Sequence, residues 1–228
     1  MIRIEFEYAD SLKTDFEVKG EFYRLKRDDN TAVICRRRVE ITLKSGSIEQ
    51  PVDAVAVLMN PGSIRFADPE VDPESDLPLI NNAAQLPLRD SHLKPLKPDN
   101  TQYQLMRLMR QMGWQKLRLI NLSDLCDANS ASFARRYQAL DHEALPHSLL
   151  HPSRDKELSR LLKADHLLLA WGSNPVQQAD AEAFLKRVRR RKPVGLALES
   201  PWYRFASPYR KDQKMSWLQE MTHLLKQA

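Results

Sequence analysis

The chain has 228 residues, of which 42% are hydrophobic and 29% charged, and a formal net charge of +5. This composition is typical of a globular protein with one α/β domain and a smaller appendage, and no apolar run reaches the eighteen or so residues of a membrane span. The two cysteines, Cys35 and Cys126, are too few for a disulfide framework or a four-cysteine metal site. We therefore expect a cytoplasmic monomer with no secretion signal, membrane contact, metal or cofactor.

The first fifty residues are expected to be rich in β-structure. Residues 2–8, 15–25 and 32–44 alternate apolar with polar side chains and contain many β-branched or aromatic residues. Residues 1–50 are therefore predicted to be a β-rich extension, either packed on the main domain or extending its sheet.

From residue 51 onward, short apolar strands alternate with helical patterns. Four apolar segments are predicted to be strands: 52–59, 116–123, 165–172 and 193–199. Segments with a helical period are predicted to be helices at 101–113, 132–140, 153–164, 175–191 and 212–228. This alternation predicts an α/β fold over residues 51–228, a three-layer α/β/α sandwich with a four-stranded, mostly parallel sheet.

One segment departs from the alternation. Residues 61–100 hold seven of the fourteen prolines and show no clean period. A stretch of this length inside a domain is usually a lid, a binding loop or disorder. Its position directly after a strand end favours a lid.

The predicted strands end in polar residues. The first ends in Asn60-Pro61-Gly62-Ser63, the second includes Asn121, and the third ends in Trp171-Gly172. Ligands of open α/β sheets bind beyond the carboxyl ends of the strands. Asparagines at such places often cap helices or turns, but an amide that both donates and accepts also suits a nucleobase edge. Together these residues predict a polar pocket.

A basic run also stands out. Residues 186–192 hold six cations in seven positions. The run is either the solvated end of a helix, where cations suit the helix dipole, or a patch that contacts phosphates. Both interpretations stay open at this point.

Four segments resemble, in order, the motifs of the uracil-DNA glycosylase superfamily. They are VLMNPGS (57–63), LRLINLSDL (117–125), LLLAWGS (167–173) and LALESPWYRFASPYR (196–210). The first is similar to the Asn-Pro-Gly form of the mismatch-specific uracil/thymine branch, with Leu58 where that family usually has glycine. The same segments are also similar to an uncharacterised bacterial domain family with Asn-Pro-Ser and Ala-Trp-Gly motifs.

The resemblance implies a uracil-DNA glycosylase-like fold and a monofunctional DNA N-glycosylase. Such an enzyme flips a base out of single- or double-stranded DNA and hydrolyses its N-glycosidic bond, leaving an abasic site. Asn60 would position the attacking water, with Asp68 or Asp124 as a nearby carboxylate. The residues implied to hold the base are Pro61, Gly62, Ser63, Phe66, Asn121, Trp171 and Gly172.

The last motif implies a loop that presses into DNA. Its basic side chains would contact phosphates, and Trp202, Tyr203 or Phe205 would either fill the vacated stack or pack in the core. The DNA-contacting residues so implied are Ser200, Pro201, Trp202, Tyr203, Arg204, Ser207, Pro208, Arg210 and Lys211.

The long insertion bears on the substrate. A tight uracil pocket does not need forty extra residues, so we expect a modified pyrimidine, conceivably a hypermodified cytosine of phage DNA, and hence a role in antiviral defence. Two alternatives remain open: a non-catalytic nucleic-acid-binding protein with this fold, and a hydrolase of free nucleosides or nucleotides.

Overall fold

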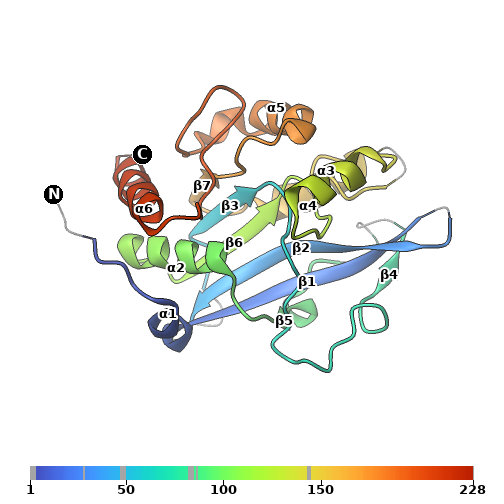
Figure 1. Ribbon diagram of the computed structural model, residues 1–228, viewed down its shortest axis with the longest axis horizontal. Helices are drawn as coiled ribbons and strands as arrows, with labels where there is room; N and C mark the ends of the chain where they lie inside the picture. Colours follow the sequence, from blue (N-terminus) through green and yellow to red (C-terminus); the bar gives the residue numbers. More distant parts are fainter. Residues whose placement is uncertain are drawn as a thin grey trace.

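A single seven-stranded sheet flanked by helices organises the computed structural model (Figure 1). The structure describes residues 4–27, 29–46, 50–81, 85, 87–142 and 145–227. Its strands are β1 (Phe16–Lys26), β2 (Ala32–Leu43), β3 (Ala54–Leu58), β4 (Leu79–Ile80), β5 (Lys94–Pro95), β6 (Lys116–Asn121) and β7 (His166–Leu169). Its α-helices are α1 (Ala9–Asp15), α2 (Asn100–Met112), α3 (Ser130–Gln138), α4 (Asp155–Leu161), α5 (Gln178–Val188) and α6 (Lys211–Leu225).

The sheet is mixed. Its strand order is β4-β1-β2-β6-β3-β7, with β5 pairing with β1 outside this path. Strands β6, β3 and β7 are parallel to one another, whereas β1 with β2 and β2 with β6 are antiparallel. The α/β class is confirmed, and β1 and β2 extend the parallel strands.

The expected count of four strands is wrong. Residues 193–199 contribute only an isolated parallel bridge from Val194 to Leu168, because the chain then turns back and Ala197 pairs with Tyr203. At the other end of the chain, the described part of the predicted strand 2–8, residues 4–8, forms no strand. There the Glu7 carbonyl oxygen accepts from Arg107 Nε at 2.7 Å instead of joining a ladder. Residues 1–3 lie outside the described residues.

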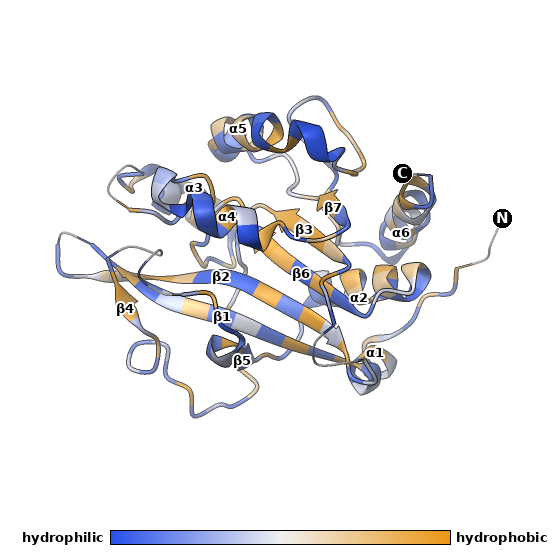
Figure 2. Ribbon diagram, turned by 180° about the vertical axis from the view of Figure 1, so that it is seen from behind, coloured by the Kyte–Doolittle hydropathy of each residue, from blue (hydrophilic) through white to orange (hydrophobic). Residues whose placement is uncertain are grey.

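Helices cover both faces of the parallel strands, which gives three layers. Side chains of α2 and α6 pack with Ala54, Ala56 and Leu58 of β3, while those of α4 and α5 pack with Val55 and Val57. Figure 2 shows the hydrophobic residues along β3 and β6 between these layers. Helix α3 covers a third apolar cluster on the far part of β1 and β2. No helix in the described part of the chain is both long and apolar enough to cross a membrane.

Helix α2 shows why the sequence pattern was informative. Asp99 accepts from the Gln102 amide N–H at 2.9 Å, and the Gln102 side chain accepts from the Asp99 N–H at 2.9 Å, a reciprocal capping box. At the other end, Gly113 adopts φ 70°, a left-handed conformation that favours glycine. The predicted helix 101–113 is therefore confirmed within one residue at each end.

An extra residue in β2 divides three consecutive arginines between the two faces of the sheet. Glu21 of β1 pairs with Arg38 and Phe22 pairs with Arg36, so Arg37 forms a β-bulge. Arg37 and Arg38 both turn to the α4 side, where they donate to Glu21 at 3.0 and 2.8 Å. Arg36 is left on the α2 side. These buried charges interrupt the hydrophobic colour of β2 in Figure 2.

The proline-rich insertion runs along the outer edge of the sheet. Strand β4 pairs with Arg24 and Leu25 of β1, and β5 pairs with Lys19 and Gly20. The insertion therefore satisfies the backbone of β1, which would otherwise be an exposed edge strand. Residues 82–84 and 86 of this segment lie outside the described residues.

Candidate active site

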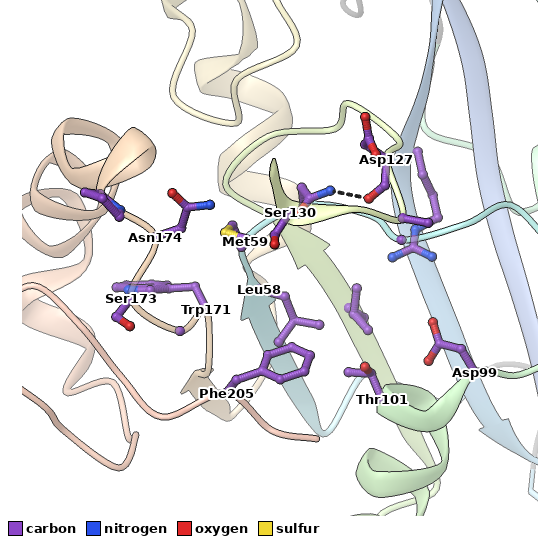
Figure 3. Close-up of a pocket in the computed structure, with 17 residues that line it drawn as sticks. Leu58, Met59, Asp99, Thr101, Asp127, Ser130, Trp171, Ser173, Asn174 and Phe205 are labelled. Carbon is purple, nitrogen blue, oxygen red and sulfur yellow. Dashed lines mark hydrogen bonds between the residues drawn. The ribbon is translucent and has the colours of Figure 1, made fainter. Parts of the chain in front are cut away.

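A cavity of about 730 Å³ opens at the carboxyl ends of β3 and β7 (Figure 3). Figure 3 shows Trp171 and Phe205 on one side of it and Asp99 with Thr101, from the start of α2, on the other. The residues that line it are Arg36, Leu58, Met59, Asn60, Gly62, Asp99, Thr101, Leu119, Asp127, Ala128, Ser130, Trp171, Gly172, Ser173, Asn174, Pro175 and Phe205. The predicted pocket position, beyond the strand ends, agrees with this cavity.

Asn60 lies in the cavity wall with its amide fixed. Its Nδ2 donates to the carbonyl oxygens of Pro61 and Asp127 at 2.8 and 2.9 Å, and the second bond is dashed in Figure 3. The Asp127 N–H donates back to the Pro61 carbonyl at 3.0 Å. These bonds join the turn after β3 to the loop before α3 and leave Asn60 Oδ1 with no donor among the described residues.

Asn121 lies beneath the cavity and is absent from its lining. Its side chain is fully buried, and its Oδ1 accepts from Arg36 Nη2 at 3.4 Å. Within the described chain, Asn121 Nδ2 and Arg36 Nε have no hydrogen-bond partner. Arg36 itself lines the cavity, so this guanidinium, and not the Asn121 amide, is the polar group presented there. Burial lowers the pKa of Arg36, although nearby carboxylates oppose the shift.

Two carboxylates complete the polar lining. One oxygen of Asp99 caps α2. Asp127 is partly buried, which opposes ionisation, but hydrogen bonds from the Asn129 N–H, Ser132 and Arg136 lower the pKa of its carboxyl. The cavity lining therefore includes the Arg36 guanidinium, whereas the Asp127 carboxylate is bonded to Ser132 and Arg136.

Of the other residues implied to contact the base, some line the cavity and some do not. Trp171 and Gly172 line the cavity, and Gly172 has a left-handed φ of 80°. Phe66 is outside the lining and packs edge-on against Phe22 with ring centroids 5.0 Å apart, because Phe66 forms a bridge with Leu96.

The residues of the turn after Asn60 also differ in whether they line the cavity. Gly62 lines the cavity, whereas buried Pro61 and exposed Ser63 are outside the lining. Asp68 is exposed and outside it as well, because its carboxylate accepts from the Glu70 N–H at 2.9 Å in a local turn. Apart from Gly62 and Asp99, the insertion contributes no lining residue from its described part, so it lies beside the cavity and does not cover it.

Asp124, considered as a second carboxylate, belongs to a buried network instead. It accepts from Tyr23 Oη at 2.8 Å and pairs with Arg154 at 2.8 Å. Burial raises the pKa of Asp124 to about 6, against the opposing effect of the Arg154 guanidinium. Next to it, Ser123 Oγ contacts His147 Nδ1 at 2.9 Å, and burial lowers the pKa of His147 to about 3.

The closing loop, residues 200–211, brings one aromatic side chain to the cavity. Phe205 lines it and is 41% exposed. Trp202 and Tyr203 instead pack against the apolar cluster beneath α5, with Tyr203 edge-on to Trp171 at 5.3 Å. The loop is held close by Gly195, where a Cβ would lie 2.5 Å from Tyr203 Cδ1 and 2.6 Å from the Leu169 carbonyl. Its Ser200-Pro201 bond is cis.

The polar residues of this loop contact other parts of the protein. Arg204 pairs with Glu220 at 2.9 Å, Arg210 with Asp212 at 2.5 Å, and Lys211 donates to Tyr8 Oη at 2.8 Å. Ser207 Oγ donates to the Asn100 carbonyl at 3.2 Å, and Pro208 is half-buried beside it. These ion pairs are exposed, and such pairs contribute only about 0–1 kcal/mol, so phosphates can displace them.

Sequence reasoning missed Arg36, Asp99, Thr101 and Asp127. Arg36 is hidden in a run of three arginines that looks like the polar face of a strand, and its burial depends on the bulge at Arg37. A signal for Asp99 existed, because Asp99 and Gln102 have capping-box spacing before the predicted helix. No group of three or more His, Cys, Asp or Glu side chains in the described segments is arranged to hold a metal ion.

Comparison with known proteins gives one match. A protein-family model described as "Protein of unknown function (DUF1643)" matches residues 80–200, just over half of the chain. The matched region contains Asp99, Asp127 and Trp171 of the cavity lining but ends short of Phe205, and it begins after Asn60. No curated protein and no solved structure matches the chain.

Proposed function

We propose that this chain, which belongs to the DUF1643 family, is a monofunctional DNA N-glycosylase that admits a flipped, modified pyrimidine nucleotide to the cavity beside Asn60. The observation that carries the proposal is the immobilised Asn60 amide in the wall of a 730 Å³ cavity at the strand ends. Cavities of about 300–1,000 Å³ hold ligands of drug size, which includes a nucleoside with a substituted base.

Asn60 supplies the water-positioning group in this proposal. Both hydrogen bonds of its Nδ2 are made to backbone carbonyls, so the Oδ1 direction is fixed and can accept from a water molecule. An amide takes up no proton at neutral pH, so the water attacks after the C–N bond has largely broken. The glycosidic electron pair leaves with the base, the water oxygen bonds to the sugar carbon, and the water's proton ends on the base.

Charge in the cavity supports the same chemistry. Breaking the glycosidic bond develops positive charge on the sugar and negative charge on the base, and fixed charges of opposite sign stabilise both. Arg36, in the cavity lining, is the cation suited to the departing base. Arg36 therefore takes the base-contacting role that the sequence suggested for Asn121, and Asn121 becomes a positioning residue through its 3.4 Å contact with Arg36.

The closing loop offers a way to hold DNA at the cavity. Phe205 at the cavity mouth and Tyr209, which is 98% exposed, are aromatic side chains that can stack on bases. Arg204, Arg210 and Lys211 exchange their weak surface contacts for phosphates when a strand arrives.

The test is a base-release assay on single-stranded and duplex DNA that carries a panel of modified pyrimidines, including phage DNA with and without hypermodified cytosine. Asn60→Ala is expected to lower the rate of base release by about 100-fold or more while DNA affinity is kept. Asn100→Ala, an exposed asparagine outside the cavity lining, is the matched control and should act like the wild type. Equal rates for Asn60→Ala and the wild type would reject the site.

A non-catalytic nucleic-acid-binding protein is the second candidate. It is favoured by one observation: the Asn60 nitrogen serves the local turn and the Asn121 side chain is buried, so neither side-chain nitrogen is available to a base. DNA binding without release of any base from the panel would support this alternative over the glycosylase.

A further inference from the structure

A second hollow of about 730 Å³ lies at the opposite edge of the parallel strands from the cavity. Lys116 is the first residue of β6, Val52 lies just before β3, and Asp165 just before β7, so this hollow is at the amino ends of the strands. We call it the amino-end groove. Its lining consists of Gln50, Pro51, Val52, Asp90, Lys116, Arg118, Arg160, Lys163, Ala164, Asp165 and Arg191.

The amino-end groove is strongly cationic. Five of its lining residues are Lys or Arg and two are Asp. One of the two, Asp90, is already paired with Arg38 at 3.1 Å, and Arg118 is paired with Glu40 at 2.7 Å. Lys116, Arg160 and Lys163 form no ion pair with any described carboxylate. Cations that share a groove without carboxylate partners repel each other, and an anionic ligand relieves that repulsion.

The basic run 186–192 continues this surface. It begins in the last turn of α5, a helix that starts near the cavity at Gln178 and ends at Val188, and it continues beyond the helix end. Arg191 lies in the groove, where its Nη2 donates to the Ala164 carbonyl at 2.8 Å, and the other cations of the run are exposed. The run thus contributes one cation, Arg191, to the hollow, and its other cations lie on the surface beside it.

We propose that the amino-end groove binds the phosphodiester backbone of a nucleic-acid segment separate from the one whose base enters the cavity. The two ends of β6, Lys116 and Asn121, are five residue steps apart, which separates the two sites by roughly 17 Å at about 3.3 Å per step. A stiff duplex seated on the cavity mouth does not wrap around the sheet to reach the opposite edge. The groove therefore serves a second segment, and this inference does not require the proposed function.

The spacing of the cations favours a polymer over a small ion. Lys116, Arg160, Lys163 and Arg191 come from β6, from α4 and the loop after it, and from the turn after α5, so the cations are distributed around the groove, as suits several successive phosphates. Backbone contacts of this kind read no sequence and are weakened by salt.

The experiment measures binding of an unmodified duplex of about 12 base pairs, which is too stiff to bend around the sheet and engage both edges of one molecule. The groove variant is Lys116→Ala/Arg160→Ala/Lys163→Ala. The control variant, Lys26→Ala/Arg135→Ala/Lys226→Ala, likewise removes two lysines and one arginine, all exposed and outside the groove. Fluorescence anisotropy at several salt concentrations gives affinity and salt slope, and titration at high protein concentration gives the number of duplexes per chain.

We expect the groove variant to bind duplex about tenfold more weakly than the control at moderate salt, with a salt slope smaller by about 2 to 3. The wild type and the control should each bind one more duplex per chain than the groove variant, whether or not the cavity also binds DNA. Equal affinity and equal stoichiometry for the groove variant and the control would overturn the proposal. Inorganic tripolyphosphate and unlabelled duplex are also compared as competitors, each counted by its concentration of phosphate groups. If tripolyphosphate displaces the labelled duplex at the lower concentration, the groove is a site for a small ligand and the proposal is overturned. None of these measurements uses base release, so they are independent of the glycosylase test.

Discussion

Arg154 offers the sharpest test of how the strand ends behind the cavity are stabilised. Its guanidinium is fully buried and pairs with Asp124 at 2.8 Å and with Glu157 at 2.5 Å. Its Nη1 also lies 3.3–3.5 Å from the carbonyls of residues 146–148, distances at which hydrogen bonds are weak. In Arg154→Met, the Tyr23 hydroxyl is the one hydrogen-bond partner that the Asp124 carboxylate keeps among the described residues.

The expected loss follows from these contacts. Removing one member of a buried ion pair costs about 3–5 kcal/mol, because the remaining charge is left unpaired. At a urea dependence of about 2 kcal/mol per M, a loss of about 4 kcal/mol lowers the unfolding midpoint by about 2 M. Arg187→Met is the matched control, since Arg187 pairs with Asp155 at 3.3 Å on the surface, where such pairs contribute about 1 kcal/mol or less.

The pH dependence of the same variant adds a second test. The pKa of Asp124 is already raised to about 6 with Arg154 present, and loss of the guanidinium raises it further. Lowering the pH from 8 to 5 therefore protonates Asp124 in the folded variant and removes the unpaired charge. The difference in free energy of unfolding between wild type and Arg154→Met should then be smaller at pH 5 than at pH 8. Urea unfolding at both pH values measures this difference. A loss for Arg154→Met no larger than that for Arg187→Met, or a deficit that does not change with pH, would refute the reasoning.

Three further predictions concern stability. Gly195→Ala should lower the free energy of unfolding by about 3 kcal/mol, because its Cβ would meet the Leu169 carbonyl at 2.6 Å. Gly62→Ala, which has open space around it, is the control. Equal thermal midpoints for the two variants would contradict the packing argument. Asp99→Ala should cost about 1 kcal/mol through loss of the capping box, and an unchanged urea midpoint would show that the cap is unimportant. His147 stays neutral in the folded state because burial lowers its pKa to about 3, while the unfolded chain protonates below about pH 6.5. Stability is therefore lost as pH falls, and between pH 7.5 and 5.5 the wild type should lose about 1.4 kcal/mol more than His147→Asn in urea unfolding; parallel pH curves would contradict this.

Elements with a strong local signal could be predicted from the sequence. The apolar run at β3 and the capped, periodic pattern of α2 each specify one structure without help from distant residues. Residues 193–199 look equally strand-like, but the chain reverses there so that Tyr203 can pack against Trp171. That outcome depends on tertiary contacts, which no short window of sequence contains.

The part of the candidate site that follows strand ends could also be predicted from the sequence, and the part that depends on strand pairing could not. Asn60, Gly62, Trp171 and Gly172 line the cavity because they follow strand ends, a position that the alternation of strands and helices reveals. Asn121 also lies at a strand end but is covered by Arg36, which comes from a strand that pairs antiparallel with β6. The sequence carries no local sign that β2 lies beside β6, so Arg36 could not be placed.

The extra residue of β2, Arg37, determines which side chains of this strand face which side of the sheet. On one side of it the even-numbered residues Ile34 and Arg36 face α2, and on the other side the odd-numbered Val39 and Ile41 do. Deleting one residue here would shift the register of one part of β2. Either Arg36 would leave the cavity lining, or Val39 and Ile41 would turn toward the side of the sheet that holds Glu21 and Arg38. Deleting one residue at this point is therefore expected to disturb the protein more than substituting most of its neighbours.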